Sequence, residues 1–407
     1  MKIQLTTKLL LATMLILSSF TVLAQEQFES EGTDFWLTFM PNYHNHIQGI
    51  YESRDSLYIF ITSKYPTKGI IYYNEVVGNN TTPKEHHFEI TQPNQIYTFP
   101  ICYKKVALNG FNNSGQIVNN LSETDCEVVS QKSFRVVTEE KSTVYALDYA
   151  EMTADAFIVL PVHTLGKEYF VMSYNSDGRT EFNQQISGQS TPSQFAIVAV
   201  KDNTNITIYP KVSTAKFGMD KQNITLNQGE VYLVQTKITP DSLRNDLSGT
   251  HIVADKEIAV FGGHQRTSLP ANTAVISRDC LIIQLISVHL WGRNAIITPF
   301  ARPTIHNLSN NLPDIYRVMA AKNNTTIYVN ETTVANLDAG EFYEAELKEV
   351  ALISSNNPIM VAQYKKSEAL TASNNVYGDP LMLIVPPVEQ YKADYICYKS
   401  AGKNWQH

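Results

Sequence analysis

Ile61–Asn74 reads ITSKYPTKGIIYYN, and two later stretches repeat its pattern: Ile197–Pro210 reads IVAVKDNTNITIYP and Val318–Asn330 reads VMAAKNNTTIYVN. Each stretch joins an apolar run to a second run, which alternates β-branched or aromatic residues with others, through a polar turn. This pattern is typical of a β-hairpin, and its recurrence at domain-scale intervals indicates a modular chain. We therefore expect an all-β protein of repeated antiparallel modules.

Each hairpin phrase is followed by a further strand and then by a second apolar–polar–apolar stretch. We interpret this second stretch as another hairpin, with Asp, Asn and Pro residues that tolerate tight backbone geometry at its turn. The three predicted turns are Glu139–Lys141, Ala254–Lys256 and Asn356–Pro358.

A strongly apolar phrase closes each module, at Ala156–Tyr174, Leu281–Phe300 and Leu381–Tyr398. Runs such as LIIQLI predict strands that are buried on both faces. The opening TDFWLTFMPNY (Thr33–Tyr43) resembles the second half of this phrase.

These phrases divide the chain into modules of roughly 33–165, 166–290 and 291–398. We expect the modules to be sandwich-like, with a propeller-like ring as the alternative. The intervals between hairpin phrases, 136 residues (61 to 197) and 121 residues (197 to 318), are long for propeller blades of roughly 40–50 residues. The pattern predicts a further module after Tyr398, so the chain is expected to be incomplete at its C-terminus.

The first 24 residues have the features of a secretory signal peptide. Lys2 and Lys8 lie before a short apolar run. Small residues at the end of this run predict cleavage after Ala24. No later stretch approaches the roughly 18 apolar residues that span a bilayer. Residues 25–407 are therefore expected to be secreted or displayed at the cell surface, without a membrane span.

The formal charge is −7, and removal of Lys2 and Lys8 with the signal peptide makes it −9. An acidic chain without basic runs offers no surface to neutralise phosphates, which argues against nucleic acid as a partner.

Four cysteines remain after the predicted cleavage, and in an exported chain they allow three disulfide connectivities. Cys102 with Cys126 is the first choice, because the Gly- and Asn-rich segment between them is predicted to be a loop. Cys280 and Cys397 lie beside apolar strands and either pair or stay buried as free thiols.

No stretch indicates a catalytic or metal centre. His44 and His46 would share one face of a strand, and His86, His87 and His264 are further candidates, but zinc needs three or four converging ligands. The carboxylates that a glycosidase would need are scattered. They are Asp34, Glu52, Asp55, Asp155 and Glu168. We therefore predict no catalytic residues, no metal and no cofactor.

Aromatic residues are the remaining candidates for contact with a partner. The chain has 22 tyrosines, some in adjacent aromatic pairs such as Tyr72-Tyr73 and Phe342-Tyr343. Trp36 and Trp291 lie within apolar phrases, and we expect them to be contact residues only if they are exposed. Most aromatic residues should fill the β-core, and the rest could form a recognition surface.

Four stretches follow one another in a fixed order: GTDFWLTFMPNY, GTHIVADKEIAVFGGH, CLIIQLISVHLWGRNAIITPF and DIYRVMAAKNNTTIYVN. In this order they resemble the IgGFc-binding protein N-terminal domain family, known from a mucus-associated animal protein and from exported bacterial proteins, notably of Bacteroidetes type. The resemblance covers most of Gly32 to Tyr398. It implies an extracellular binding or adhesion module, with no catalytic residues to carry over.

The sequence departs from the family pattern at one cysteine. Animal members have a cysteine just after the Gly-His step, which the resemblance pairs with the counterpart of Cys280; here that place is near Arg266. The resemblance thus implies that Cys280 has lost its usual partner.

We expect a non-catalytic module that recognises a host or mucosal glycoprotein or a surface partner, either protein or glycan. IgG Fc binding belongs to the animal protein and is not the favoured partner here. The alternatives are a structural spacer that displays a missing C-terminal domain, and a carbohydrate-active enzyme. Binding predicts an exposed aromatic and Asn-rich patch, whereas an enzyme predicts a cleft with two carboxylates.

Overall fold

A computed structural model describes residues 29–42, 56–78, 80–110, 124–150, 153–177, 191–237, 245–271, 277–301, 313–367 and 379–392. These residues form three antiparallel β-sheets with short 3₁₀ turns, and none of them lies in an α-helix. The prediction of repeated antiparallel all-β modules is confirmed. The predicted signal peptide, 1–24, lies outside the described residues.

Each sheet contains seven or eight strands. The first sheet consists of β1 (Gly32–Thr38), β2 (Ser56–Ser63), β3 (Thr67–Val77), β4 (Asn80–Ile90), β5 (Ile96–Ile101), β7 (Ser133–Ala150) and β8 (Thr153–Val159). The second sheet consists of β6 (Val129–Ser130), β9 (Gly166–Phe170), β10 (Ser193–Ala199), β11 (Thr204–Tyr209), β12 (Gln222–Leu226), β13 (Val231–Gln235), β14 (His251–Thr267) and β15 (Asp279–Gln284). The third sheet consists of β16 (Gly292–Ile297), β17 (Asp314–Ala320), β18 (Thr325–Val329), β19 (Thr332–Leu337), β20 (Phe342–Leu347), β21 (Ala351–Lys365) and β22 (Leu381–Val385).

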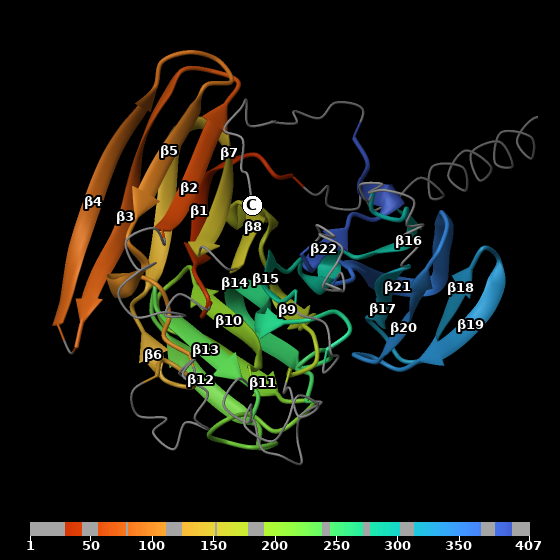
Figure 1. The fold of residues 1–407 in the computed structure, drawn as a ribbon. Helices are drawn as coiled ribbons and strands as arrows, with labels where there is room; N and C mark the ends of the chain where they lie inside the picture. The colour runs from red at the N-terminus through yellow and green to blue at the C-terminus, as the bar shows by residue number, and fades with distance from the viewer. Residues whose placement is uncertain are drawn as a thin grey trace, which may run out of the picture.

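One long strand organises each sheet: β7, β14 and β21, of 18, 17 and 15 residues. The first half of β7 pairs with β1 and β3, and its second half pairs with β2 and β8. β14 and β21 repeat this arrangement with the equivalent strands of their own sheets. Because each long strand serves two sets of partners, each sheet curls into an open half-barrel (Figure 1). The sandwich-like expectation is confirmed.

The repeated phrase is not a β-hairpin, and this sequence prediction was wrong. β2 and β3 do not pair with each other; they pair with the two halves of β7. In the same way, β10 and β11 pair with the two halves of β14, and β17 and β18 pair with the two halves of β21. The predicted second hairpin was also wrong, because β14 runs unbroken through Ala254–Lys256. A polar break between two apolar runs also occurs where a chain crosses from one layer of a sandwich to the other, or where a strand bends. The sequence pattern alone cannot separate these cases.

Three glycines allow the close contact that closes each module. Gly32, Gly166 and Gly292 open β1, β9 and β16, and they lie against the residues that open the 3₁₀ turns η3 (Val162–Thr164), η6 (Val288–Leu290) and η7 (Val388–Gln390). A Cβ atom at Gly166 would lie 2.0 Å from Ser287 Oγ, so no side chain fits there. β1 thus occupies in the first sheet the place of β9 and β16 in the others. This explains the similarity between Thr33–Tyr43 and the later phrases.

The first two sheets share one hydrophobic core, which also takes in part of the third sheet. The rest of the third sheet has a separate core around residues such as Val318 and Ile353. Trp36 is 7% exposed and Trp291 is 2% exposed, so both belong to the core and neither is a contact residue.

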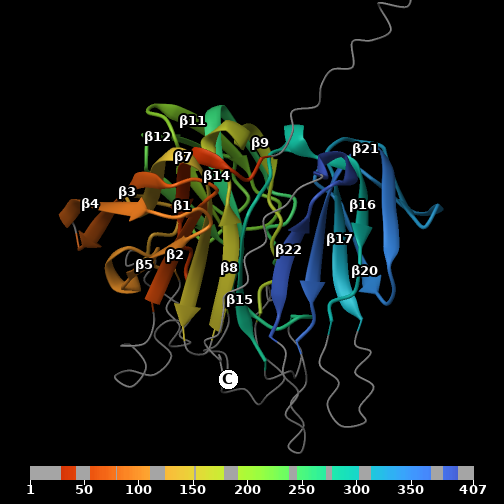
Figure 2. The same ribbon diagram turned by 90° about the horizontal axis from the view of Figure 1, so that it is seen from above.

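The first and second sheets meet along β8 and β15, which lie side by side with β22 in the middle of the molecule (Figure 2). Side chains, not ladder hydrogen bonds, join β8 to β15. Asp279 Oδ1 accepts from the Ala154 N–H at 2.7 Å, Asp155 Oδ2 accepts from the Ile282 N–H at 2.9 Å, and Gln284 Oε1 accepts from the Leu160 N–H at 2.8 Å. Burial raises the pKa of Asp155 to about 7 and that of Asp279 well above its usual value, despite these bonds.

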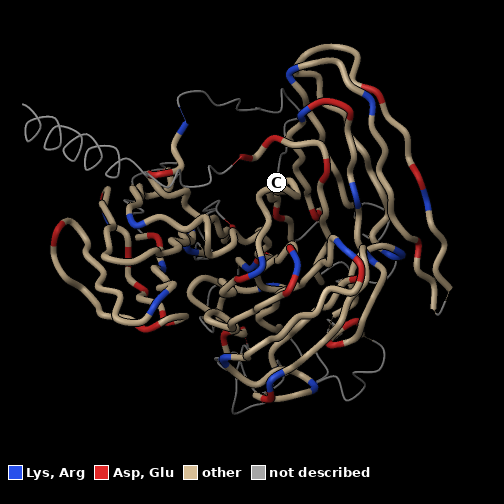
Figure 3. The backbone as a smooth tube through the Cα atoms, turned by 180° about the vertical axis from the view of Figure 1, so that it is seen from behind, with Lys and Arg blue, Asp and Glu red and all other residues tan. Residues whose placement is uncertain are grey.

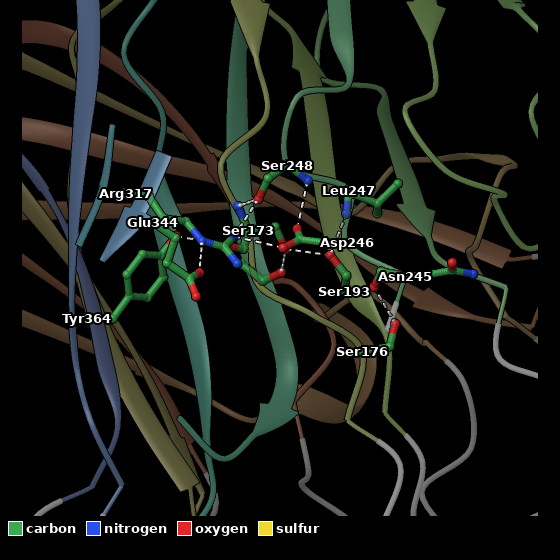
Figure 4. A network of polar contacts seen from close by, with 11 residues as sticks. Ser173, Ser176, Ser193, Asn245, Asp246, Leu247, Ser248, Arg317, Glu344 and Tyr364 are labelled. Carbon is green, nitrogen blue, oxygen red and sulfur yellow. Dashed lines mark hydrogen bonds and ion pairs between the residues drawn. The ribbon is translucent and has the colours of Figure 1, made fainter. Parts of the chain in front are cut away.

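The second and third sheets meet around the buried guanidinium of Arg317 (Figure 4). Its Nη1 lies 2.7 Å from Asp246 Oδ2, and its Nε lies 2.7 Å from Glu344 Oε2. Nη1 also donates to the carbonyl of Ser173 at 3.0 Å, and the Tyr364 hydroxyl donates to the same carbonyl at 2.8 Å. Two carboxylates and a carbonyl therefore neutralise and hydrogen-bond a cation that burial would otherwise make costly.

Candidate binding face

The outward side of the first sheet carries an array of six side chains on three adjacent strands. Ile70 on β3 lies opposite His87 on β4 and Val137 on β7. Lys68 lies opposite Glu89 in the next row, and Glu139 is two residues beyond Val137 on the same side of β7. We call these six residues the groove face: Lys68, Ile70, His87, Glu89, Val137 and Glu139.

A surface groove of about 520 Å³ lies on the groove face, and the six residues line it together with Gly69, Phe88 and Thr138. Its apolar floor contains Ile70 and Val137, and charged or polar side chains stand around the floor. Its volume falls in the range of about 300–1,000 Å³ that small-molecule sites occupy.

Gly69 fixes the layer beneath the groove. A Cβ atom there would lie 2.4 Å from Phe88 Cζ and 2.5 Å from the carbonyl oxygen of Val137. The Phe88 ring therefore packs directly on the backbone of β3. This close packing makes the floor a rigid part of the sheet.

The charged side chains of the groove face are weakly tied to one another. Lys68 Nζ lies 3.8 Å from Glu89 Oε1, and both side chains are more than half exposed. His87 Nε2 lies 3.8 Å from Glu85 Oε2, also at the surface. Glu139 has no hydrogen-bond or ion-pair partner for its carboxylate among the described residues. Exposed pairs of this kind contribute about 0–1 kcal/mol, so these groups can exchange partners at little cost.

The second sheet has the same register but a different surface at the equivalent positions. We call these six residues the polar face: Asn205, Thr207, Asn223, Thr225, Val253 and Asp255.

Side chains of the polar face bond to one another. Asn205 Nδ2 donates to Asp255 Oδ2 at 2.8 Å, Thr225 Oγ1 donates to Asn205 Oδ1 at 2.9 Å, and Thr207 Oγ1 donates to Asn223 Oδ1 at 3.1 Å. In the third sheet, Asn356 Oδ1 similarly accepts from the Thr326 N–H at 2.8 Å. The first sheet differs because its longer charged side chains and its isoleucine form no such network.

A row of aromatic and cationic side chains borders each of the two faces. On the first sheet, Arg135 pairs with both oxygens of Asp34 at 3.0 and 2.8 Å, and its Cζ lies 5.3 Å from the centre of the Trp36 ring. The hydrogen bonds that Arg135 donates to the Asp34 carboxylate raise the pKa of Arg135, so the guanidinium stays charged. Tyr72 lies opposite Arg135 on β3.

On the second sheet, His251 takes the place of Arg135, stacked between Phe170 and Tyr209 with ring centres 4.5 and 5.8 Å away. Tyr209 is 45% exposed and Lys221 lies over its ring. Asn205 and Asn223 also lie exposed on this outward side of the second sheet.

The candidate histidines in the described ranges have different surroundings and do not form one site. His44 and His46 lie outside the described residues. His86 is hydrogen-bonded to the Tyr97 hydroxyl at 2.5 Å, and His87 belongs to the groove face. His264 is fully buried, and burial lowers its pKa to about 3, so its imidazole is neutral at physiological pH. No group of three or more His, Cys, Asp or Glu residues in the described ranges could hold a metal, and the prediction that there is no metal site stays a prediction.

The three candidate carboxylates in the described ranges each have a separate partner. Asp34 is paired with Arg135, Asp155 accepts from the Ile282 N–H, and Glu168 lies 2.9 Å from His251 Nε2. Glu52 and Asp55 lie outside the described residues.

Cys102 is exposed, Cys126 and Cys280 are buried, and all three are free thiols. Burial raises the pKa of Cys126 to about 12 and that of Cys280 well above its usual value, so both thiols are protonated. Cys397 lies outside the described residues. Cys102 is not bonded to Cys126 in this structure, and their pairing in the exported chain stays a prediction.

The adjacent aromatic pairs divide between inside and outside, as strand alternation requires. Tyr73 packs inside on Phe99 and Phe134, whereas Tyr72 points outward. Phe342 lies over the guanidinium of Arg317 at 4.4 Å.

Sequence reasoning missed the groove face and the Arg317 junction. A strand register puts Ile70 beside Val137, which are 67 positions apart in the sequence (137 − 70). The one local indication was Gly69 within a strand, which often marks a close approach of two chain segments. Figure 3 shows Lys and Arg interspersed with Asp and Glu over all three sheets, so charge gives no further guide.

Comparisons with known proteins give two matches. A family profile described as IgGFc binding protein matches residues 155–406. The human protein named IgGFc-binding protein is 23% identical over 292 residues, which cover 68% of this chain and 5% of the human protein. The chain thus spans a small part of that relative's length. In the described ranges, no helix has the length and apolar character needed to cross a membrane.

Proposed function

Because this chain belongs to the IgGFc binding protein family, we propose that it is a non-catalytic, extracellular module that binds a glycoprotein. The matched residues begin in β8 and continue through the second and third sheets. The name of the human relative indicates that IgG Fc is bound by that protein. Family membership supports binding as the class of activity, while the partner of this chain is a separate question.

One structural observation carries the proposal: the outward side of the first sheet carries an open groove of about 520 Å³, with an apolar floor and charged side chains around it. A spacer needs no such groove, and the separate partners of Asp34, Asp155 and Glu168 favour binding over glycoside hydrolysis.

The test is a glycoprotein array that contains mucins, IgG and isolated IgG Fc, probed with the purified chain at physiological salt. Saturable binding to at least one glycoprotein is expected. A folded sample that binds no glycoprotein at micromolar concentration would remove the proposal and leave the spacer role. Binding to Fc alone would show that this chain shares the partner named for the human relative.

Export by the predicted signal peptide, residues 1–24, is part of the same proposal. Expression of the full chain in a secreting host should release a product that begins at Gln25. N-terminal sequencing of that product checks this expectation.

A further inference from the structure

We propose that the groove face of the first sheet binds a neutral sugar ring, with Ile70 and Val137 beneath the ring and the charged side chains at its edges. This inference rests on the proposed function, because it names the part of the glycoprotein that is recognised. The groove lies on β3, β4 and β7, within residues 68–139, which is outside the range 155–406 that the family profile matches. It is therefore a feature of this chain and not of the matched family region.

The floor of the groove fits the apolar face of a sugar. Ile70 and Val137 lie directly opposite each other on adjacent strands, so their methyl groups form one continuous apolar surface. A pyranose ring presents C–H groups on one face, and removing both surfaces from water is favourable. The Phe88 ring packs below the floor, against the backbone at Gly69.

The rim supplies the hydrogen-bonding groups that sugar hydroxyls need. Glu89 and Glu139 offer carboxylate acceptors, and Lys68 between them offers three N–H donors. The Lys68–Glu89 pair at 3.8 Å is loose, and Glu139 has no partner for its carboxylate among the described residues. These groups can therefore turn to a ligand without breaking a strong internal interaction.

The charge of the rim favours neutral sugars over acidic ones. Two carboxylates and one ammonium give the row Glu89–Lys68–Glu139 a net negative charge. A sialic acid or sulfate placed there would face like charges, which reduces affinity.

The polar face of the second sheet provides a comparison inside the same molecule. It has the same strand register and a valine at the equivalent position, Val253 for Val137, but no isoleucine. Its amides and hydroxyls are already bonded to one another. A ligand would have to replace those bonds, whereas on the groove face it would add new ones.

The experiment uses the full chain and an array of neutral oligosaccharides that end in galactose, N-acetylglucosamine, mannose or fucose. Sialylated and sulfated forms of the same oligosaccharides are included. The Kd of the best neutral oligosaccharide is then measured by calorimetry for the wild type, Val137→Glu and Val253→Glu. The two variants place the same carboxylate at equivalent outward-facing positions of the two sheets, and their melting curves show whether both are folded.

We expect a neutral oligosaccharide to bind more tightly than its sialylated form. Val137→Glu should raise its Kd at least tenfold, and Val253→Glu should leave it within about twofold. Glu139→Gln should weaken binding severalfold and reduce the preference for the neutral form, a readout that loss of stability would not produce. The inference is overturned if Val137→Glu binds like the wild type, if Val253→Glu loses binding instead, if only acidic sugars bind, or if no oligosaccharide binds.

A second comparison separates this inference from the proposed function. A glycoprotein that binds on the array is tested again after enzymatic removal of its glycans. Loss of binding supports the sugar site. Equal binding before and after removal overturns the sugar site while the proposal of a glycoprotein partner stands, now through its polypeptide.

Discussion

Arg317 is the residue whose replacement should cost the most stability at the junction of the second and third sheets. Its side chain is fully buried between Asp246, Glu344 and the Ser173 carbonyl. Arg317→Met would leave Asp246 as a buried carboxylate without its partner, so we expect a loss of roughly 3–5 kcal/mol in the free energy of unfolding. Urea denaturation measures this loss.

The control for this prediction is Arg293→Met, because Arg293 is exposed. Its effect should stay within about 0.5 kcal/mol. Equal effects of the two variants would show that the Arg317 ion pairs contribute nothing to the junction.

His264 should make the protein less stable in acid. Burial lowers its pKa from 6.5 to about 3 in the folded state. The folded state therefore binds this proton more weakly than the unfolded state does. The stability that neutral His264 contributes is complete above about pH 6.5 and is lost as the pH falls towards 3, by up to about 1.4 kcal/mol per pH unit.

His264→Gln removes this titration, so its free energy of unfolding should fall less steeply than that of the wild type between pH 6.5 and 4. Denaturant titrations at several pH values measure the two slopes. His87→Gln is the matched control, because the His87 side chain is 71% exposed. Parallel pH curves for wild type and His264→Gln would contradict the prediction.

At the scale of elements, the contact between β9 and η6 depends on the absence of a side chain at Gly166. Gly166→Ala would place Cβ 2.0 Å from Ser287 Oγ and 2.6 Å from Ser287 Cβ. Either β9 or η6 must shift, and we expect a loss of roughly 1–3 kcal/mol, as for other overpacked sites. The melting temperature and a urea titration measure it.

Gly78→Ala separates crowding from backbone strain. Gly78 has φ +59° and open space around its Cβ position, so its replacement carries only the strain of a left-handed backbone, roughly 1 kcal/mol. If Gly166→Ala also carries Ser287→Gly, part of the lost stability should return. No recovery in this double variant would show that Ser287 is not the obstacle.

At the scale of the whole molecule, the two hydrophobic cores predict two patterns of local unfolding. Ile353 lies in the separate core of the third sheet, whereas Ile197 lies in the core that the first two sheets share. Both side chains are fully buried, and Ile→Ala in such positions removes roughly 2–5 kcal/mol.

Hydrogen exchange should resolve the two cases, because it reports stability segment by segment. Ile353→Ala should speed exchange mainly in β16 to β22. Ile197→Ala should speed it in strands of both the first and second sheets. If Ile353→Ala speeds exchange equally in all three sheets, the molecule unfolds as one unit and the separation of the cores has no energetic meaning.

Local patterns predicted the strands well and their partners poorly. The alternation in Ile61–Asn74 correctly indicated two strands, because the side-chain period of a strand is a local property. The partner of each strand was wrong, since both belong to the long strand β7, about 70 residues further along the chain (133 − 63). Strand pairing depends on which apolar faces can be buried together. For these strands the partner is distant in the sequence, so local patterns do not identify it.

The candidate site shows the same limit at the level of single residues. The sequence marked His87 and Trp36, but it did not mark Ile70, Val137 or Glu139. Trp36 was removed from the contact candidates by burial against the second sheet, where the turn at Gly229 approaches its ring. Exposure is a property of the assembled sheets, so composition and spacing could not assign it.

The sequence by itself determined that this chain is all-β, antiparallel and built from similar modules, because strand periodicity and the repeated phrases are local. It also carried enough ordered motifs to indicate the family. Only the tertiary structure decided that each sheet curls around one long strand, that Arg317 closes the junction of the second and third sheets, and that an open groove lies on the first sheet. These features arise from contacts between residues dozens to hundreds of positions apart. Such contacts form where strand register and burial bring the residues together, and no local sequence pattern predicts them.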